Sequence, residues 1–185
     1  MPFFMLECWE SASVEYVTLR EVPRFVNFSW LSGSLMPSDV LPSPLRLEVM
    51  GEPEHVIPPM IDEGIPVFRS DMIETIRGMG VDNFQSFEVE LLDTRNSTLL
   101  SGYHAVNIIG LVAATDFPNS DYQAHGRPLV DVDFDKLAID EAKAHGLLMF
   151  RLAECVSGIV VDERLRGPLA RIGGLSLVDP ADWIG

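Results

Sequence analysis

One run of the chain, residues 65–93, constrains the fold more than any other because it predicts a strand, a helix and a second strand in direct succession. The helix is expected to begin at Ser70 or Asp71, both good N-caps, and to end at Gly80. Its apolar residues recur at helical spacing on one side: Met72, Ile73, Ile76 and Met79.

The same order recurs in residues 159–178. A short apolar strand precedes a helix capped by Asp162, which stops at the glycine pair 173–174 before a last strand. Pro168 lies inside this helix, where its ring predicts a kink or a split into two turns. The two runs share a structural plan without a clear repeat in sequence.

Only strands are expected between these two runs. A hairpin turn is predicted at residues 94–97, residues 105–114 indicate a buried strand, residues 129–140 alternate with period two, and residues 146–152 form an apolar strand. The predicted fold class is therefore α+β, with a mostly antiparallel sheet flanked by two short helices.

The first third of the chain, residues 1–64, is irregular and Pro-rich. Six prolines between residues 37 and 59 interrupt any long helix or interior strand. Beyond one strand at residues 14–19, we expect this segment to wrap the rest as loops and short edge strands. The chain has 185 residues, 47% of them hydrophobic, which suits a single domain whose α+β core spans residues 65–185.

The charge balance restricts the class of partner. The chain carries 28 Asp and Glu against 13 Lys and Arg, a formal net charge of −15. This charge opposes binding to nucleic acid and to anionic membrane surfaces, and it attracts a basic partner. The start of the chain lacks an export-signal pattern, so a cytoplasmic location is expected, and the apolar run 105–114 is too short to span a membrane.

No catalytic or cofactor-binding motif stands out. The four histidines are scattered without a nucleophile motif, and the glycines of residues 77–82 indicate a helix end rather than a phosphate loop. Cys8 and Cys155 lie far apart without further ligand spacing, which argues against a disulfide framework and a structural zinc site. We therefore predict no enzyme activity, no cofactor and no resident metal.

Three aspartates, Asp131, Asp133 and Asp135, occupy alternate positions between apolar residues. Because successive side chains of a strand point to opposite faces, the three carboxylates are expected on one face. An ordinary solvated face, a face that binds a basic partner and a metal site are all compatible with this pattern, although the spacing and glycine of an EF-hand loop are absent.

A polar connection at residues 115–128 follows the predicted buried strand. Loops on a rigid scaffold often carry recognition, and tyrosine beside carboxylates suits docking on a basic protein. A plain solvent loop is the alternative. Together with the three strand aspartates, the candidate partner-binding residues are Asp116, Asp121, Tyr122, Asp131, Asp133 and Asp135.

Three groups of residues carry a resemblance to a known family. They are Tyr103, Asn107, Asp116, Ser120 and Tyr122, then Phe150, Arg151 and Leu152, and then Val161, Asp162, Leu165 and Gly174. In these positions residues 65–178 resemble immunity protein family eleven of bacterial polymorphic toxin and type VI secretion systems. Where this chain has Asp162 the family often has serine, and both residues are good N-caps.

The resemblance implies an antitoxin that binds and neutralises a cognate toxin in interbacterial competition and has no catalytic residues of its own. We expect a cytoplasm-acting toxin, preferably a nuclease, because nucleases present basic surfaces for phosphate that an acidic protein can occupy. The expected complex is a one-to-one heterodimer in which the toxin's active site or substrate groove is blocked. An effector chaperone or adaptor for a secretion system is the alternative, and a small metal-dependent hydrolase built on the aspartates is a further one.

Overall fold

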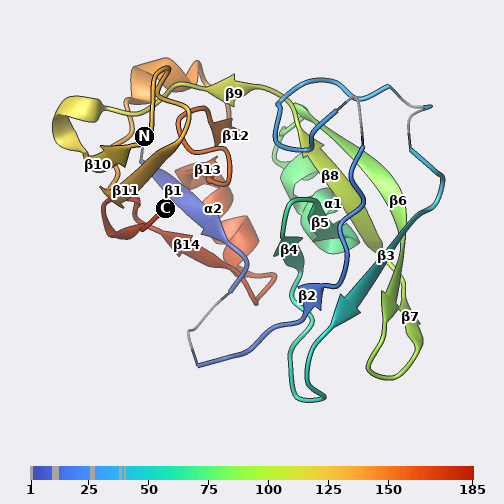
Figure 1. Ribbon diagram of the computed structural model, residues 1–185. Helices are drawn as coiled ribbons and strands as arrows, with labels where there is room; N and C mark the ends of the chain where they lie inside the picture. Colours follow the sequence, from blue (N-terminus) through green and yellow to red (C-terminus); the bar gives the residue numbers. More distant parts are fainter. Residues whose placement is uncertain (1, 10–12, 26–27, 38, 40) are drawn as a thin grey trace.

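The computed structural model describes residues 2–9, 13–25, 28–37, 39 and 41–185 (Figure 1). Within these ranges the chain forms two α-helices and fourteen strands, most of them paired antiparallel. The α+β class expected from the sequence is confirmed. The strands form a seven-stranded sheet, a five-stranded sheet and a two-stranded ribbon rather than one sheet.

The large sheet contains strands from the first two thirds of the chain. In spatial order they are β2 (Thr18–Leu19), β3 (Leu45–Met50), β6 (Phe84–Asp93), β8 (Tyr103–Ile108), β5 (Pro66–Arg69) and β4 (Met60–Asp62), and β7 (Thr98–Leu100) pairs with the end of β6. The pairing of β3 with β6 is parallel and the others are antiparallel. The predicted hairpin at residues 94–97 joins β6 to β7.

The small sheet combines the start and the end of the chain. Its spatial order is β14 (Ser176–Val178), β1 (Phe3–Glu7), β13 (Ile159–Asp162), β12 (Met149–Leu152) and β9 (Leu111–Val112), with a parallel pairing only between β12 and β9. The ribbon consists of β10 (Asp121–Ala124) and β11 (Val132–Lys136). Three short 3-10 helices complete the elements: η1 (Phe117–Asn119), η2 (Glu141–Ala144) and η3 (Pro180–Asp182).

Helix α1 (Ser70–Gly78) follows β5 and leads into β6, as the sequence predicts. Its buried residues are Met72, Ile73 and Ile76, whereas Met79 lies beyond the helix and is exposed. The N-cap is Arg69, one residue before the expected position, and the hydroxyl of Ser70 instead donates to the carbonyl of Gly102. Gly80 has a φ of +94°, a left-handed conformation that glycine adopts without strain and that ends the helical run.

Helix α2 (Glu163–Ala170) repeats this plan between β13 and β14. The side chain of Asp162 accepts a hydrogen bond from the backbone N–H of Arg164, which confirms the predicted N-cap. Pro168 lies inside the helix, which continues to Ala170 as one element instead of splitting. In both units one antiparallel strand lies between the two parallel strands, β8 in the first and β1 in the second, so each unit is a split β-α-β motif.

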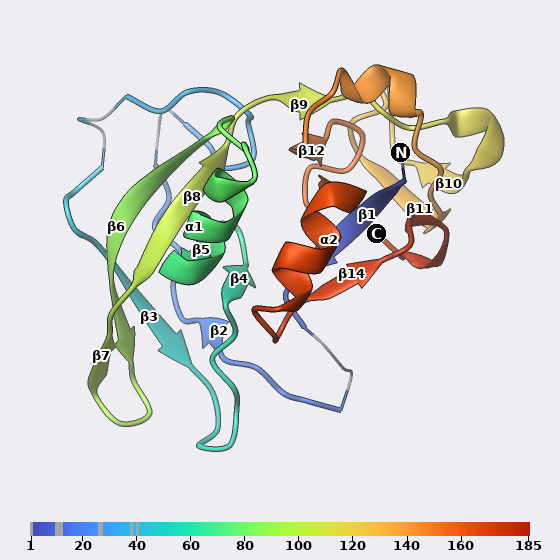
Figure 2. The same cartoon turned by 180° about the vertical axis from the view of Figure 1, so that it is seen from behind.

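The two helices contact each other in the middle of the molecule, each on its own sheet (Figures 1 and 2). One apolar core joins the helix-covered faces of both sheets, with Phe4, Phe68, Met72 and Leu165 among its buried residues. A second core covers the opposite face of the large sheet, and a third covers the opposite face of the small sheet. Each sheet is thus buried on both faces, which explains its long apolar runs.

The first third of the chain contributes more than the loops and short edge strands that we expected. β1 lies inside the small sheet between β14 and β13, and β3 lies inside the large sheet between β2 and β6. The prediction is wrong for these two strands because neither contains a proline, so every backbone N–H is free to pair. The strand expected at residues 14–19 is reduced to β2 and a single bridge from Tyr16 to Val56.

The apolar run 105–114 is also divided differently from the predicted single strand. Its first part belongs to β8 in the large sheet and its second to β9 in the small sheet. Gly110, with a φ of +91°, lies at the break and lets the chain cross between the sheets. Neither helix of the described residues is long and apolar enough to cross a membrane.

Candidate functional site

The β10–β11 ribbon lies against the outer face of the small sheet (Figure 1). Val132 and Phe134 of β11 are 2% and 1% exposed and belong to the core that covers this face, together with Phe3 and Phe150. The alternation predicted from the sequence is therefore confirmed for β11: its apolar side chains point to the sheet and the residues between them point to water.

Backbone hydrogen bonds hold the ribbon on both edges of β11. On one edge β10 pairs with it, Tyr122 opposite Phe134 and Gln123 opposite Asp133. On the other edge the N–H of Val132 donates to the carbonyl of Glu154 at 3.1 Å, and Phe134 and Gly185 exchange two backbone hydrogen bonds. A strand fixed in this way presents its outward side chains in a defined geometry.

The three aspartates of the alternating pattern project outward together. Asp131 precedes β11, Asp133 and Asp135 lie on it, and all three are exposed. A carboxylate oxygen of Asp133 lies 2.7 Å from Nε2 of His125. That hydrogen bond, followed by the charge of Asp133, raises the pKa of His125 above its ordinary value of 6.5.

The other three candidate residues lie in different settings. The ring of Tyr122 is 40% exposed and contacts Phe117 and Phe134, so it is on the inner face of the ribbon, opposite the three aspartates. Asp121 is exposed at the start of β10, across from Lys136 and next to a register shift. Asp116 accepts a hydrogen bond from the side chain of Asn119 and belongs to the turn around η1.

Some acidic residues elsewhere in the described chain have arginine partners. These ion pairs are Arg20–Glu48, Arg46–Glu90, Arg69–Asp71, Arg95–Asp93 and Arg164–Asp162. Among the described residues, Asp131, Asp133 and Asp135 form no ion pair with a lysine or arginine. The outward face of the ribbon therefore carries negative charge that the protein itself leaves largely uncompensated.

A second group of charges lies at the seam, the place where the side chain of Arg151 of β12, in the small sheet, reaches Asp62 of β4, in the large sheet. Arg151 of β12 is fully buried, and its guanidinium lies 3.1 Å from a carboxylate oxygen of Asp62 of β4. The same guanidinium donates to the carbonyls of Val156 and Ser157. Burial raises the pKa of Asp62, and the charge of Arg151 opposes this effect.

The sequence offered only a faint indication of the seam. Asp62 and Arg151 are 89 positions apart, beyond the reach of any local pattern. The one sign is Arg151 itself, a lone charge inside the apolar run 146–152, because a charge in a buried strand needs a partner. A lone charge in an apolar strand predicts a buried ion pair, but it does not predict which residue is the partner.

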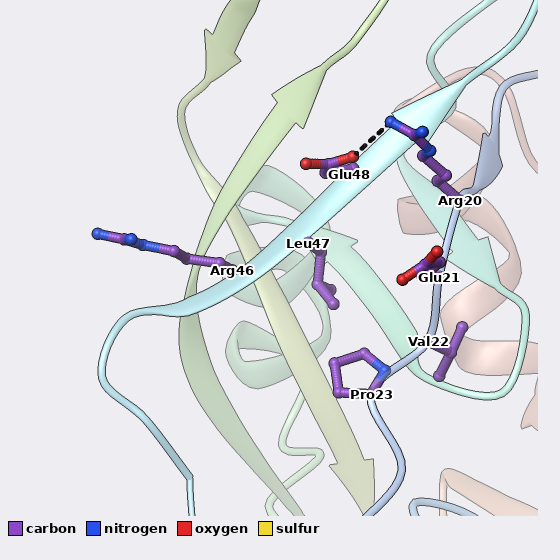
Figure 3. Close-up of a pocket in the computed structure, with 7 residues that line it drawn as sticks. All are labelled: Arg20, Glu21, Val22, Pro23, Arg46, Leu47 and Glu48. Atoms are coloured by element: carbon purple, nitrogen blue, oxygen red, sulfur yellow. Dashed lines mark hydrogen bonds and ion pairs between the residues drawn. The ribbon is translucent and has the colours of Figure 1, made fainter.

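A shallow hollow of about 510 Å³ lies beside β3 (Figure 3). One wall carries the Arg20–Glu48 ion pair, and Arg46 points away from the other labelled side chains and pairs with Glu90. The described residues that line it include no His, Cys or Ser, and of its two carboxylates, Glu21 and Glu48, the second is held in the ion pair with Arg20.

No family model matches the chain, and no curated protein is similar to it at a significant level. The described part of the chain also contains no group of three or more His, Cys, Asp or Glu side chains placed to hold a metal ion. This result covers Asp131, Asp133 and Asp135 as well, because side chains at alternate positions of one strand face lie side by side and do not converge on a point.

Proposed function

We propose that the protein is an immunity protein, an antitoxin that binds and neutralises a cognate secreted bacterial toxin. The observation that carries the proposal is the ribbon. Three exposed aspartates without arginine partners lie on or directly before a strand whose two edges are hydrogen-bonded and whose inner face is buried. The resemblance of residues 65–178 to immunity protein family eleven, which is carried by sequence motifs alone, motivates the same proposal, and no family model matches the chain.

The ribbon suits a basic partner with a rigid surface. The backbone of β11 is already fixed by hydrogen bonds on both edges, so binding costs little backbone conformational entropy. With a net charge of −15, the protein steers a basic protein toward itself over distances comparable to the Debye length, about 10 Å at 0.1 M salt. The partner we favour is a nuclease that acts in the cytoplasm, because its phosphate-binding groove is basic.

The proposed mechanism is occlusion in a one-to-one complex. Asp131, Asp133 and Asp135 occupy the positions that substrate phosphates take in the toxin's groove, and the toxin's lysines and arginines become their partners. Tyr122 and Asp121 lie at the edge of the ribbon, where a partner that overhangs β10 contacts them. The antitoxin itself performs no chemistry.

The test uses the toxin domain encoded beside the gene for this protein. Calorimetry at two salt concentrations, with a toxin activity assay, is expected to give nanomolar, salt-sensitive binding and one-to-one loss of activity. Reversal of the ribbon charges, Asp131→Lys, Asp133→Lys and Asp135→Lys together, is expected to weaken binding at least about 100-fold.

The matched control changes net charge equally at a distance from the ribbon: Glu52→Lys, Glu54→Lys and Glu74→Lys, three exposed positions. It is expected to weaken binding less than about 10-fold, through the loss of long-range steering alone. Equal losses in the two triple variants would remove the ribbon from the interface. Tight binding that leaves the toxin fully active would instead favour an effector chaperone or adaptor.

A further inference from the structure

A cavity of about 220 Å³ opens at the seam, where β1 ends. Its walls come from four parts of the chain: residues 6–9, Met60 and Asp62 of β4, residues 157–158, and residues 183–185. The guanidinium of Arg151 donates hydrogen bonds to the carboxylate of Asp62 and to the carbonyl of Ser157, so it holds two of these walls in place. The cavity is therefore built on buried structure and not on a loop alone.

The charge in this cavity is unbalanced. Asp62 is neutralised by Arg151. The carboxylate of Glu7 accepts a hydrogen bond from the indole N–H of Trp183, a neutral donor, and forms no ion pair among the described residues. Burial raises the pKa of the Cys8 thiol to about 11, so this side chain is uncharged at neutral pH. One carboxylate, that of Glu7, is left without a cation.

Two indole rings share the cavity with this carboxylate. Trp9, 49% exposed, and Trp183, 6% exposed, both line it. The face of an indole ring attracts organic cations through its quadrupole, and this attraction grows when water is excluded. A carboxylate together with indole rings in a small recess is the combination that recognises ammonium and guanidinium groups.

We propose that the seam cavity binds a small organic cation, an alkylammonium or guanidinium group, with Glu7 as its counter-ion and Trp9 and Trp183 as its aromatic walls. The volume lies below the roughly 300–1,000 Å³ of sites for drug-sized ligands, so it suits a small amine or one side chain. This site adjoins the ribbon, because its wall residue Gly185 is hydrogen-bonded to Phe134 of β11 and the ring of Trp183 packs near that of Phe134. None of the three ribbon aspartates lines it, and the proposal does not depend on the antitoxin function.

The first test is a titration with methylguanidinium chloride and, separately, methylammonium chloride, at constant ionic strength, followed by the NMR signal of the Trp183 indole N–H. A saturable shift with a dissociation constant on the order of millimolar is expected, since such small ligands have few atoms to contribute. Glu7→Gln is expected to weaken binding at least about 10-fold and Trp9→Leu at least about 3-fold.

Glu74→Gln is the matched control, because it makes the same change at an exposed position of α1 that does not line the cavity, and it is expected to leave the titration unchanged. A shift that does not saturate, or an equal response of Glu7→Gln and Glu74→Gln, overturns the proposal. Both variants are checked for cooperative thermal unfolding, so that a misfolded protein is not taken for a lost site.

Two sources of the cation are distinguished with the same assay. A capped Gly-Arg-Gly or Gly-Lys-Gly peptide that binds more tightly than the free cation supports the site as a receptor for a partner's side chain. Tighter binding of the free cation supports a small-molecule site, because the peptide backbone then obstructs entry to the cavity. Binding of neither peptide nor free cation overturns the proposal in both forms.

Discussion

At the seam the Arg151 guanidinium is withdrawn completely from water and meets Asp62, whereas on the ribbon Asp131, Asp133 and Asp135 extend into water with no arginine beside them. Aspartate therefore serves two purposes in this protein. A buried carboxylate must be matched within the protein, because an unpaired buried charge is costly. An exposed carboxylate is stabilised by water and stays available to a partner.

This difference predicts where the free energy of unfolding is sensitive to charge. Removing a charge at the seam alters stability, while removing a charge on the ribbon alters binding and leaves stability almost unchanged. Glu7 lies between the two cases, since it is largely withdrawn from water at the seam but has no cation.

The largest effect is expected for Arg151→Met. This change leaves Asp62 without its counter-charge and the carbonyls of Val156 and Ser157 without their donor, so we expect a loss of about 3–5 kcal/mol in the free energy of unfolding, measured by urea denaturation. A second change, Asp62→Leu, is expected to restore part of this loss because it removes the uncompensated carboxylate.

The control for Arg151→Met is Arg46→Met, which breaks the exposed pair with Glu90. The Arg46 side chain is 82% exposed, and the expected change is within about 0.5 kcal/mol. A loss below about 1 kcal/mol for Arg151→Met would contradict the assignment of the seam as the charge-sensitive part of the molecule.

A smaller effect, opposite in sign, is expected for Glu7→Gln. Burial raises the pKa of Glu7 above 4.5, so the folded state favours the protonated carboxyl. Its contribution to stability is fully present below pH 4.5 and is lost as the pH rises through the raised folded-state pKa. Glutamine keeps an acceptor for Trp183 without the charge, and we expect a gain of less than about 1 kcal/mol near pH 7 that disappears near pH 4.

Urea denaturation of Glu7→Gln at several pH values checks this expectation. Asp135→Asn serves as the comparison, because its exposed carboxylate is expected to give no pH-dependent gain. If Glu7→Gln were less stable than the parent protein near pH 7, the charge at Glu7 would be compensated after all. If Glu7→Gln gains stability near pH 7 and also loses cation binding in the titration, the charge of Glu7 serves binding at a cost in stability.

On the ribbon, the double change Asp131→Asn and Asp135→Asn is expected to shift the free energy of unfolding by no more than about 0.5 kcal/mol, measured by the same method. Neither residue forms an ion pair with a lysine or arginine of the described chain, so no internal contact is lost. A loss above about 1 kcal/mol would show that these carboxylates support the fold and would erase the contrast with the seam.

The smallest effect concerns one titration. Asp133→Asn is expected to lower the pKa of His125 toward 6.5, because the hydrogen bond to Asp133 is the largest cause of the raised value. The contribution of this pair is present below pH 6.5 and is lost as the pH rises through the His125 pKa of the folded protein. NMR titration of the His125 ring measures the shift, and an unchanged pKa would mean that the contact does not persist in solution. Asp135→Asn is the control and is expected to leave this pKa nearly unaltered.

Features that depend on neighbours in the chain were predictable from the sequence. The helical spacing of Met72, Ile73 and Ile76 predicted the buried face of α1, and Asp162 predicted the start of α2. Period-two alternation predicted the outward direction of Asp133 and Asp135. Tyr122, grouped with them as a candidate, lies on the other ribbon face because its pairing opposite Phe134 turns it inward.

Features that depend on distant pairing were not predictable in this way. The sequence of β1 indicates an apolar segment, but nothing in it selects β13 and β14 as its neighbours. The apolar run 105–114 is continuous in sequence and yet belongs to two sheets. In each case the choice is made by the burial of side chains on both faces of a sheet, to which segments far apart in the chain contribute.

Local elements of this protein could be predicted from its sequence: two strand–helix–strand units, the alternating strand β11 and an acidic composition, whereas β10 falls in a stretch expected to be a polar loop. These follow from side-chain periodicity, capping and turn chemistry, which act over a few residues. The three-dimensional structure was needed to show that the two helices meet in one core, that Arg151 neutralises Asp62 and that Glu7 faces a cavity with two indole rings. Those contacts join residues far apart in the chain, 89 positions for Asp62 and Arg151 and 176 for Glu7 and Trp183. They form because apolar side chains and charges must both be satisfied when they are buried.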